Sequence, residues 1–445
     1  MRPTPGIRLF LCAALALSVA ACSEKSDPTS SHQSIRFYGA DGNMKNTIGE
    51  PVGKAQPGLI DGMKGTTPLT PITEEFKARL RAIDPNLKDY SYAGESYDAI
   101  IIMALATQLA RTTDATVVKN YINGVTIGGK DCSTPEDCLS LARKGTDLRY
   151  VGVTVKTGFK DKGEPSTTSY GTLHFSADSQ INKQLTEYVG AGSEAAASTD
   201  PGPAPVKTSV KEIGAPLIIG GLTAITGTNS GSNPPKRAGA RLAIEELNAA
   251  GGVLGKPIQF LDGDDGTNAD KGKAAMDAQI AQGAQMFFGP SSSGVATKLI
   301  PEAAARKVIL FAPSATSAAL SSIDDQGYFF RAAPSDELQS RALADVIMRD
   351  GVRKISILYR KDAYGEGLQQ GVKAELVKAG VEEIDIQVVG YDVPASGKAE
   401  DLKIPDQAAQ VKEFGPEGVL IIGLTESTYA LLELAAAGVD PRTAG

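Results

Sequence analysis

Hydroxyl-bearing residues gather where two expected strands end, and they are the clearest chemical signal in the sequence. The stretch GPSSSGVATKLI places Ser293 between a strand expected over 284–289 and a helix expected over 293–306. Free N–H groups and the dipole of a helix N-terminus favour a carboxylate, and a serine hydroxyl adds a donor. The same serine could simply cap the helix, which is its commonest role there. Ser293 is therefore a candidate anion ligand, with helix capping as the alternative.

Residues for acid–base or metal chemistry are scarce. The 445 residues include two histidines, His32 and His174, and no tryptophan. The SSSG stretch does not match the G-x-S-x-G of serine hydrolases, and neither histidine stands in a triad-like context. A net charge of −7 argues against a nucleic-acid partner. We therefore expect no enzyme activity, no catalytic residue, no metal site, no cofactor and no bound nucleic acid.

The first residues are typical of an export signal. Arg2 and Arg8 precede an apolar run, Leu9 to Cys22, that is too short for an ordinary transmembrane helix. The run ends in VAAC, which resembles the lipobox of bacterial lipoproteins. Residues 1–22 are thus expected to be a signal peptide, with Cys22 lipidated and residues 23–34 acting as a tether. A plain signal peptide is the alternative. Either way the chain is exported, to the periplasm or the outer cell surface.

Two further cysteines, Cys132 and Cys138, lie in KDCSTPEDCLSLA. An exported chain sits in an oxidising compartment, which predicts a local disulfide between them. Two free thiols are the alternative, and no neighbouring ligands favour a metal site.

Residues 213–445 alternate short apolar runs with amphipathic stretches. In PPKRAGARLAIEELNAAGG, Ala240, Ala243, Ile244 and Leu247 recur at helical spacing. Later helices are expected over 268–283, 293–306, 336–350, 366–379, 406–414 and 427–437. Strands alternating with such helices indicate βαβ units and parallel sheets.

This alternation is long enough for two doubly wound α/β sheets, with a change of sheet near 331–335. We expect residues 213–333 to form the core of a first lobe and residues 334–445 that of a second lobe. Residues 35–189 form another block, which has a long helix over 96–113 but too few strands for a complete sheet. The stretch 190–212 is rich in Gly, Ala, Pro and Ser and reads as a linker.

The second block resembles the leucine/isoleucine/valine-binding protein family, the type I periplasmic substrate-binding proteins of branched-chain amino acid ABC importers. The similar segments are LAIEELNAAGGVLGKPIQFLDGDDGTNADKGKAA, FFGPSSSGVA, LFAPSATSAAL, YFFRAAPSDELQSRALAD and ILYRKDAYGEGL. The resemblance covers 213–445 continuously. It implies two parallel-sheet lobes joined by a hinge, with a small ligand bound between them.

The first block resembles the other end of the same family. The similar segments are FYGADGN, GMKGTTP, YAGESYDAIIIMALA, DCSTPEDCLSLARKG and YVGVTVKTGFKDKGEPSTTSYGTLHF. In the family, the segment similar to LLELAAAGVDPRTAG leads directly into the one similar to SIRFYGADGN. The chain therefore reads as a circular permutation, with the C-terminal half of the fold before the N-terminal half. Residues 35–189 would complete both lobes. A natural origin, an engineered one and a rearranged gene fragment remain open.

The resemblance also implies a set of ligand-binding residues. Ser314 and Thr316, in FAPSATS, match positions that hold the carboxylate and ammonium of an amino acid, and Ser293 matches a carboxylate ligand. Asp41, in YGADGN, matches an acid facing the ammonium, and a charge-assisted hydrogen bond there is of the strong kind. Tyr364 matches a tyrosine of the second lobe. The alternatives are a Pro/Ser/Thr turn for the first pair and an Asp-Gly turn for Asp41.

One segment departs from the family pattern. Leucine and valine binders carry aromatics just after the strand where this chain has Leu424 and Thr425. Glu426 and Tyr429 could line the pocket instead, with a solvated helix start as the alternative. The departure leaves the side-chain specificity open.

The resemblance implies a lipid-anchored substrate-binding protein of an ABC importer. Its partners would be an amino acid or related amide and the permease subunits. A ligand-sensing receptor domain of the same fold and a non-functional rearranged fragment are the alternatives.

Overall fold

The computed structural model describes residues 35–207 and 215–442. The predicted signal peptide, the lipidated Cys22 and the tether lie outside these residues. Within the two ranges, no helix has both the length and the apolar character needed to cross a bilayer.

The first sheet has five parallel strands in the order β11-β10-β9-β7-β8. Its strands are β7 (Ile218–Gly221), β8 (Gln259–Leu261), β9 (Met286–Phe288), β10 (Ile309–Ala312) and β11 (Phe329–Arg331), and the helices between them are α6 (Asn233–Ala249), α7 (Ala269–Ile280) and α8 (Ser293–Arg306). Side chains alternate between the two faces, as strand geometry requires. Phe287 belongs to the core beside α7 and α8, and Phe288 belongs to the core on the opposite face. The expectation of a parallel α/β sheet is thus confirmed.

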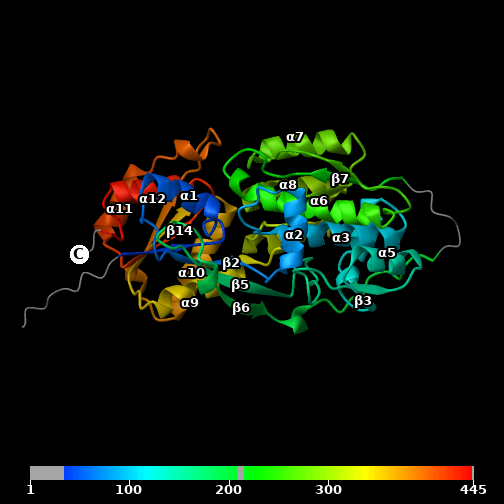
Figure 1. The fold of residues 1–445 in the computed structure, drawn as a ribbon, viewed down its shortest axis with the longest axis horizontal. Helices are drawn as coiled ribbons and strands as arrows, with labels where there is room; N and C mark the ends of the chain where they lie inside the picture. Colours follow the sequence, from blue (N-terminus) through cyan, green and yellow to red (C-terminus); the bar gives the residue numbers. More distant parts are fainter. Residues whose placement is uncertain (1–34, 208–214, 443–445) are drawn as a thin grey trace, which may run out of the picture. The chain divides into compact units, whose positions relative to one another are not determined.

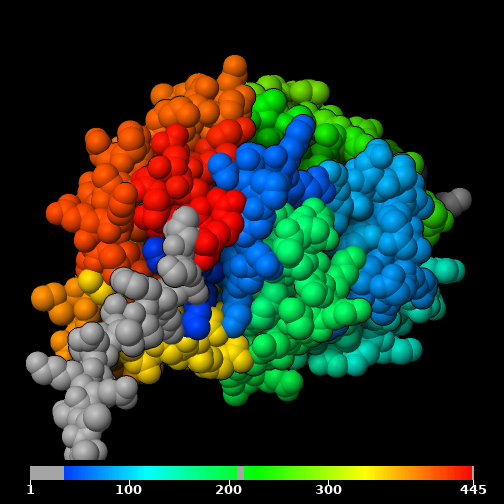
Figure 2. Space-filling model, turned by 60° about the vertical axis from the view of Figure 1, so that its left-hand side comes forward, coloured from blue at the N-terminus to red at the C-terminus, as the bar shows by residue number. Residues whose placement is uncertain are grey.

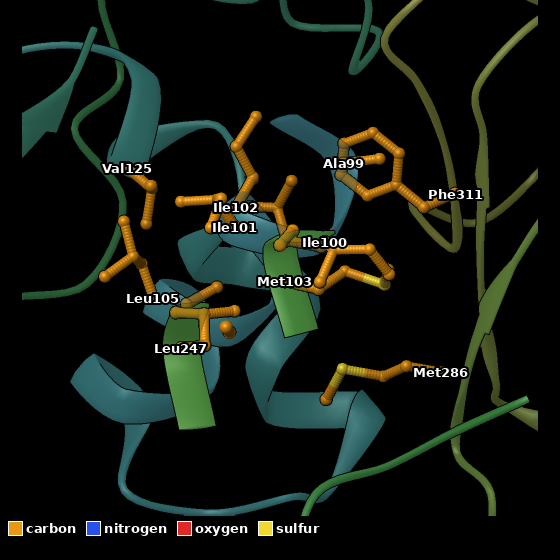
Figure 3. Close-up of a cluster of buried hydrophobic side chains, with 14 of the residues drawn as sticks. Ala99, Ile100, Ile101, Ile102, Met103, Leu105, Val125, Leu247, Met286 and Phe311 are labelled. Carbon is orange, nitrogen blue, oxygen red and sulfur yellow. The ribbon is translucent and has the colours of Figure 1, made fainter. Parts of the chain in front are cut away.

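The opposite face is covered by a helix from the first block. Helix α3 (Ala93–Ala110) is buried along its whole length, which is typical of a helix enclosed on every side. Figure 3 shows Ile100 and Met103 of α3 among Leu247 of α6, Met286 of β9 and Phe311 of β10. The same first-block region supplies α2 (Glu74–Ile83), α4 (Ala115–Val118) and α5 (Pro135–Arg143). Figure 1 shows α2 and α3 lying beside α6.

The second sheet has seven strands in the order β13-β12-β14-β1-β2-β5-β6. Its strands are β1 (Arg36–Gly39), β2 (Lys64–Pro68), β5 (Thr167–His174), β6 (Glu187–Gly192), β12 (Ile355–Arg360), β13 (Ile386–Tyr391) and β14 (Gly418–Ile422). The helices that cover it are α1 (Asn46–Ala55), α9 (Asp336–Arg349), α10 (Ala363–Lys378), α11 (Pro405–Phe414) and α12 (Ser427–Ala436). The strands from β13 to β2 run parallel, whereas β5 and β6 are antiparallel additions at one edge.

Strand β1 lies inside this sheet, between β14 and β2. Phe37 pairs with Val419 and Tyr38 pairs with Leu420, both in parallel register. Helix α1 packs against α12, and Figure 2 shows the blue start of the described chain against the red end. Gly42, just after β1, is needed here because a Cβ at this position would lie 2.0 Å from the carbonyl oxygen of Gly423.

A small parallel pair, β3 (Lys130–Cys132) and β4 (Leu148–Tyr150), stands apart from both sheets. The predicted disulfide between Cys132 and Cys138 is confirmed, and it ties β3 to α5 across a Cα–Cα distance of 5.3 Å. Thr134 caps α5 by accepting from the N–H of Asp137.

The linker begins later than the composition suggests. Strand β6 continues to Gly192, because its backbone pairs with β5 as far as Thr167. Beyond it, Val206 exchanges hydrogen bonds with the first lobe, donating to the carbonyl of Leu109 and accepting from the guanidinium of Arg111. The described part of the linker therefore lies against α3.

A buried ion pair joins the two blocks. Arg331, at the end of β11, is 1% exposed and binds the carboxylate of Glu164 through Nε at 3.0 Å. Its Nη1 donates to the carbonyls of both Ala315 and Ser317, at 3.1 and 2.9 Å. Ala315 and Ser317 flank Thr316. The ion pair between Arg331 and Glu164 therefore holds the loop that carries Thr316 in place.

Candidate functional site

All five ligand-binding residues expected from the sequence line one pocket. Ser293 follows β9, and Ser314 and Thr316 follow β10, so three of them lie at the carboxyl ends of strands in the five-stranded sheet. Asp41 follows β1, and Tyr364 begins α10 after β12, so the other two belong to the seven-stranded sheet. Carboxyl ends of parallel strands are where open α/β sheets bind ligands.

The hydroxyl side of the pocket is formed by the turn before α8 and the loop after β10. The residue that caps α8 is Ser292, whose Oγ accepts from the N–H of Val295 at 3.4 Å. Capping is therefore not the role of Ser293, whose Oγ accepts from the N–H of Ser317 at 3.1 Å. Ser314 donates to the carbonyl of Ser291 at 2.9 Å. The first turn of α8 and the hydroxyl of Ser293, whose proton these bonds do not use, make a cradle suited to a carboxylate.

The acidic side is formed by Asp41, which is 5% exposed. One carboxylate oxygen accepts from the hydroxyl of Tyr92 and the other from that of Tyr364, each at 2.6 Å. Burial, followed by the negative charge of Asp41, raises the pKa of both tyrosines well above the ordinary value. Both therefore stay protonated and keep donating. The two hydroxyls fix the carboxylate in one orientation at the wall of the pocket, where it is suited to pair with a cation.

Tyr92 was not expected from the sequence. It precedes α3 with a φ of 60°, a left-handed conformation that is rare for a bulky residue and costs on the order of 1–3 kcal/mol. Such strain tends to collect at functional sites. The conformation depends on tertiary packing around α3, so the local sequence SYAGE gave no signal of it.

Two lysines of the pocket, Lys45 and Lys236, were also missed. Lys45 occupies the N-cap position of α1 without capping it, and Lys236 is the fourth residue of α6. A cation near a helix N-terminus is repelled by the helix dipole. The unfavourable position of the two lysines was therefore the signal in the sequence that could have pointed to them. Lys236 is 1% exposed, and its Nζ donates to Ser232 at 3.0 Å and Ser314 at 3.2 Å.

In the segment that departs from the family pattern, residues 424–429, some side chains line the pocket and others are buried in the protein core. Leu424 lines the pocket. Glu426 is fully buried and binds Arg360 at 2.7 Å, so it is neither a pocket residue nor part of a solvated helix start. Arg360 also binds Asp362, which caps α10 and lines the pocket. Tyr429 packs against the core of the second lobe.

Comparison with known proteins places this geometry in a family. A family model described as "Periplasmic binding protein" matches residues 216–444. Leu/Ile/Val-binding protein homolog 3 of Brucella melitensis is 27% identical over 206 residues, which cover 45% of this chain and 54% of that protein. Leu/Ile/Val-binding protein BraC3 of Rhizobium johnstonii is 28% identical over 214 residues, covering 46% and 57%. The chain spans about half the length of the curated relatives it matches.

Solved structures give the same kind of partial match. The branched-chain amino acid transporter substrate binding protein LivJ of Streptococcus pneumoniae, in complex with isoleucine, aligns at 19% identity with a TM-score of 0.42. That alignment covers 51% of this chain and 62% of the other. The family model spans more than half of the chain, and the sheets carry their polar site where this fold class binds ligands. The chain thus belongs to the periplasmic binding protein family, type I, and is related to the branched-chain amino acid binding proteins.

Proposed function

We propose that the protein binds a free amino acid between its lobes and delivers it to the permease of an ABC importer. The observation that carries this proposal is the pairing of two unlike half-sites in one pocket. Ser293, Ser314 and Thr316 line the pocket and would receive an anion, and Asp41, held by Tyr364, lines the same pocket and would receive a cation. An α-amino acid carries a carboxylate and an ammonium on one carbon, so it complements both half-sites at once.

Binding needs a change of shape. The pocket encloses about 20 Å³, which is room for roughly one water molecule. An amino acid therefore enters only when the lobes separate, and closure by hinge bending then surrounds it. Closure also excludes water, which strengthens the ion pairs between ligand and site. No covalent step is needed, so the proposed role is binding rather than catalysis.

Purified residues 23–445 provide the direct test, by titration calorimetry and thermal melts against a panel of amino acids and small amides. A ligand that binds only the folded state raises the melting temperature. We expect at least one amino acid to do so, and expect Thr316→Val and Ser293→Ala to abolish or strongly weaken the effect. Ser322→Ala, an exposed serine of the same lobe, is the control. A cooperative melt that no panel member shifts would refute the proposal.

The importer role includes an anchor. We propose that Cys22 is lipidated and holds the protein at a bacterial membrane, where the closed form docks on the permease. Cell fractionation checks this part separately. Wild-type protein should sediment with membranes, and Cys22→Ala should be released as soluble protein; equal release of both would contradict it.

We also propose that the element order is a circular permutation of the family fold. Its support is the position of β1 beside β14, in the place that a strand following α12 takes in a right-handed βαβ unit. A second support is that α3, from the first block, fills the core of the first lobe. On this view residues 35–189 are parts of both lobes and not a separate domain.

A further inference from the structure

The pocket contains two buried lysines that have no direct ion pair among the described residues. Lys45 and Lys236 both line it, and they are 5% and 1% exposed. A buried ammonium costs several kcal/mol unless it is paired with an anion. In the described chain, no carboxylate lies within ion-pairing distance of either ammonium.

Lys236 is held by neutral groups alone. Its two hydrogen bonds go to the hydroxyls of Ser232 and Ser314, and these hydroxyls supply no compensating charge. Burial, and then the positive charge of Lys45, lowers the pKa of Lys236 to about 7. The two ammonium groups are therefore close enough to repel each other. An anion bound between them would offset this repulsion.

Lys45 has fewer hydrogen-bond partners than Lys236. Its ammonium donates no hydrogen bond to any side chain or backbone group in residues 35–207 or 215–442. Burial lowers its pKa, and the charges of Asp41 and Asp89 only partly oppose this effect. Lys45 also lines a second cavity of about 230 Å³ that adjoins the first at Tyr92. Its side chain therefore stands between the cleft and a larger space.

The acids around the cleft act on the two lysines without pairing them directly. Asp41 and Asp362 are the acids among the residues that line the pocket; Asp41 is held by two phenols, and Asp362 shares Arg360 with Glu426. Burial and the charge of Asp41 raise the pKa of Asp336 well above its ordinary value, so that carboxyl offsets little positive charge. The charges of the buried Asp265, of Asp41 and of Asp89 raise the pKa of Lys236, but none of the three lies within ion-pairing distance of it. A neutral amino acid would bring one carboxylate, in the hydroxyl cradle beside Lys236, and would leave Lys45 without an anion.

We propose that the ligand is a compact acidic amino acid, of about the size of aspartate or glutamate, whose side-chain carboxylate binds between Lys45 and Lys236. This inference rests on the proposed amino-acid-binding function and names its substrate class. The α-carboxylate would lie in the hydroxyl cradle, and the ammonium would face Asp41. The second carboxylate then supplies the charge that the two lysines lack.

The remaining lining of the pocket agrees with a polar ligand. Among the described lining residues, Leu424 is the one aliphatic side chain, and its neighbours are hydroxyl, amide and charged groups. A branched aliphatic side chain would have to desolvate both lysines without pairing them, which is unfavourable. The size of the closed pocket does not decide between these ligands, because any amino acid requires the lobes to open.

Isosteric ligand pairs test the inference on the unaltered protein. Titration calorimetry would compare aspartate with asparagine, glutamate with glutamine, and each with leucine. We expect the acidic member of at least one pair to bind about ten-fold more tightly or better, since charge-assisted hydrogen bonds are roughly twice as strong as neutral ones. Equal or tighter binding of the amide, or of leucine, would overturn the inference.

Lysine variants separate a ligand-binding role from a structural one. Lys45→Met and Lys236→Met should each reduce the acid-over-amide preference to near one while retaining binding of the amide. Without ligand, both should melt at the same or a higher temperature than wild type, because an unpaired buried charge is removed. Lys273→Met, on the exposed side of α7, is the matched control. Lower melting temperatures together with an unchanged preference would show that the lysines are structural, and would refute the inference.

The two proposals fail in different ways. Binding of an uncharged amino acid with no acidic preference refutes the substrate class and leaves the amino-acid-binding function standing. Binding of no amino acid by a cooperatively folded protein refutes the function itself, and the substrate class with it.

Discussion

Asp41 is the residue on which the proposed cation half-site depends, because its carboxylate lines the pocket and is held by two phenols. Tyr92 comes from the loop before α3 and Tyr364 from the first turn of α10. The orientation of one carboxylate is therefore set by elements of both lobes. A hydrogen bond to a charged group contributes roughly 1.5–3 kcal/mol, so each phenol matters individually.

Removal of either phenolic hydroxyl should weaken ligand binding. We expect Tyr92→Phe and Tyr364→Phe each to raise the Kd of the best panel ligand about ten-fold, since about 1.4 kcal/mol corresponds to a factor of ten. The reason is the loss of one of the two hydrogen bonds, of 2.6 Å each, that orient Asp41. Titration calorimetry checks this, with Tyr429→Phe as the control because Tyr429 packs against the second core. Unchanged affinity in both variants would show that Asp41 does not contact the ligand.

Proton uptake should accompany binding of an acidic ligand. The pKa of Lys236 in the free protein is about 7, lowered by burial and then by Lys45, while the charges of Asp265, Asp41 and Asp89 act in the opposite direction. A ligand carboxylate beside it favours the ammonium and raises the pKa, so affinity should fall as pH rises above 7. Calorimetry at pH 8 in buffers of different ionisation enthalpy should detect uptake of up to about one proton. The uptake should disappear in Lys236→Met; uptake that persists there would assign it to another group.

At the scale of elements, the buried pair between Glu164 and Arg331 couples the two blocks to the site. Arg331 holds the carbonyls on both sides of Thr316, and Glu164 holds Arg331. Burial opposes ionisation of Glu164, but the charge and hydrogen bonds of Arg331 outweigh it and lower the pKa. A segment of the first block therefore stabilises a loop of the second.

Glu164→Gln should destabilise the protein by about 3–5 kcal/mol, because it leaves a buried guanidinium unpaired. Denaturant unfolding measures this, and ligand affinity should also fall because the Thr316 loop loses its support. In wild type the contribution is complete above the ordinary glutamate pKa of 4.5. It is lost as pH falls below that value toward the lowered one, since the unfolded state then binds more protons. The variant should lack this component of acid sensitivity; an unchanged stability would show the pair to be unimportant.

Most elements were predictable from the sequence, because hydrophobic spacing within a single segment determines them. Helix α8 has the predicted bounds, and the sheet changes where expected, between β11 and α9. The site was predictable only in part. Ser293 and Thr316 stand at strand ends that the sequence reveals, whereas Lys45, Lys236 and Tyr92 become site residues only through burial against distant segments. Glu426 was misjudged for the same reason, since its partner Arg360 lies on another strand.

At the scale of the whole molecule, the proposed permutation makes a direct prediction about chain order. A chain in which residues 213–445 come first and residues 35–207 follow, joined by a short Gly/Ser segment, should fold cooperatively and bind the same ligand. The expectation follows from β1, which would then come directly after α12, the order that its pairing with β14 implies.

Thermal melts with and without ligand check the reordered chain. Its melting temperature should lie within several degrees of wild type, because the sheets and cores are the same. Each block expressed alone is the control, and neither should melt cooperatively, since α3 and the first lobe need each other for burial. A reordered chain without a cooperative transition would contradict the permutation.

The position of β1 also bears on how the chain is made. Phe37 is among the first described residues to be synthesised, yet its partner Val419 is among the last. One edge of this central strand can pair with β2, which follows closely in the sequence, but the edge that faces β14 stays unpaired through almost the whole of translation. Pairings of such long sequence separation form slowly, and open strand edges promote aggregation. Export before folding, with chaperones shielding the nascent chain, is thus the route best suited to this order of elements.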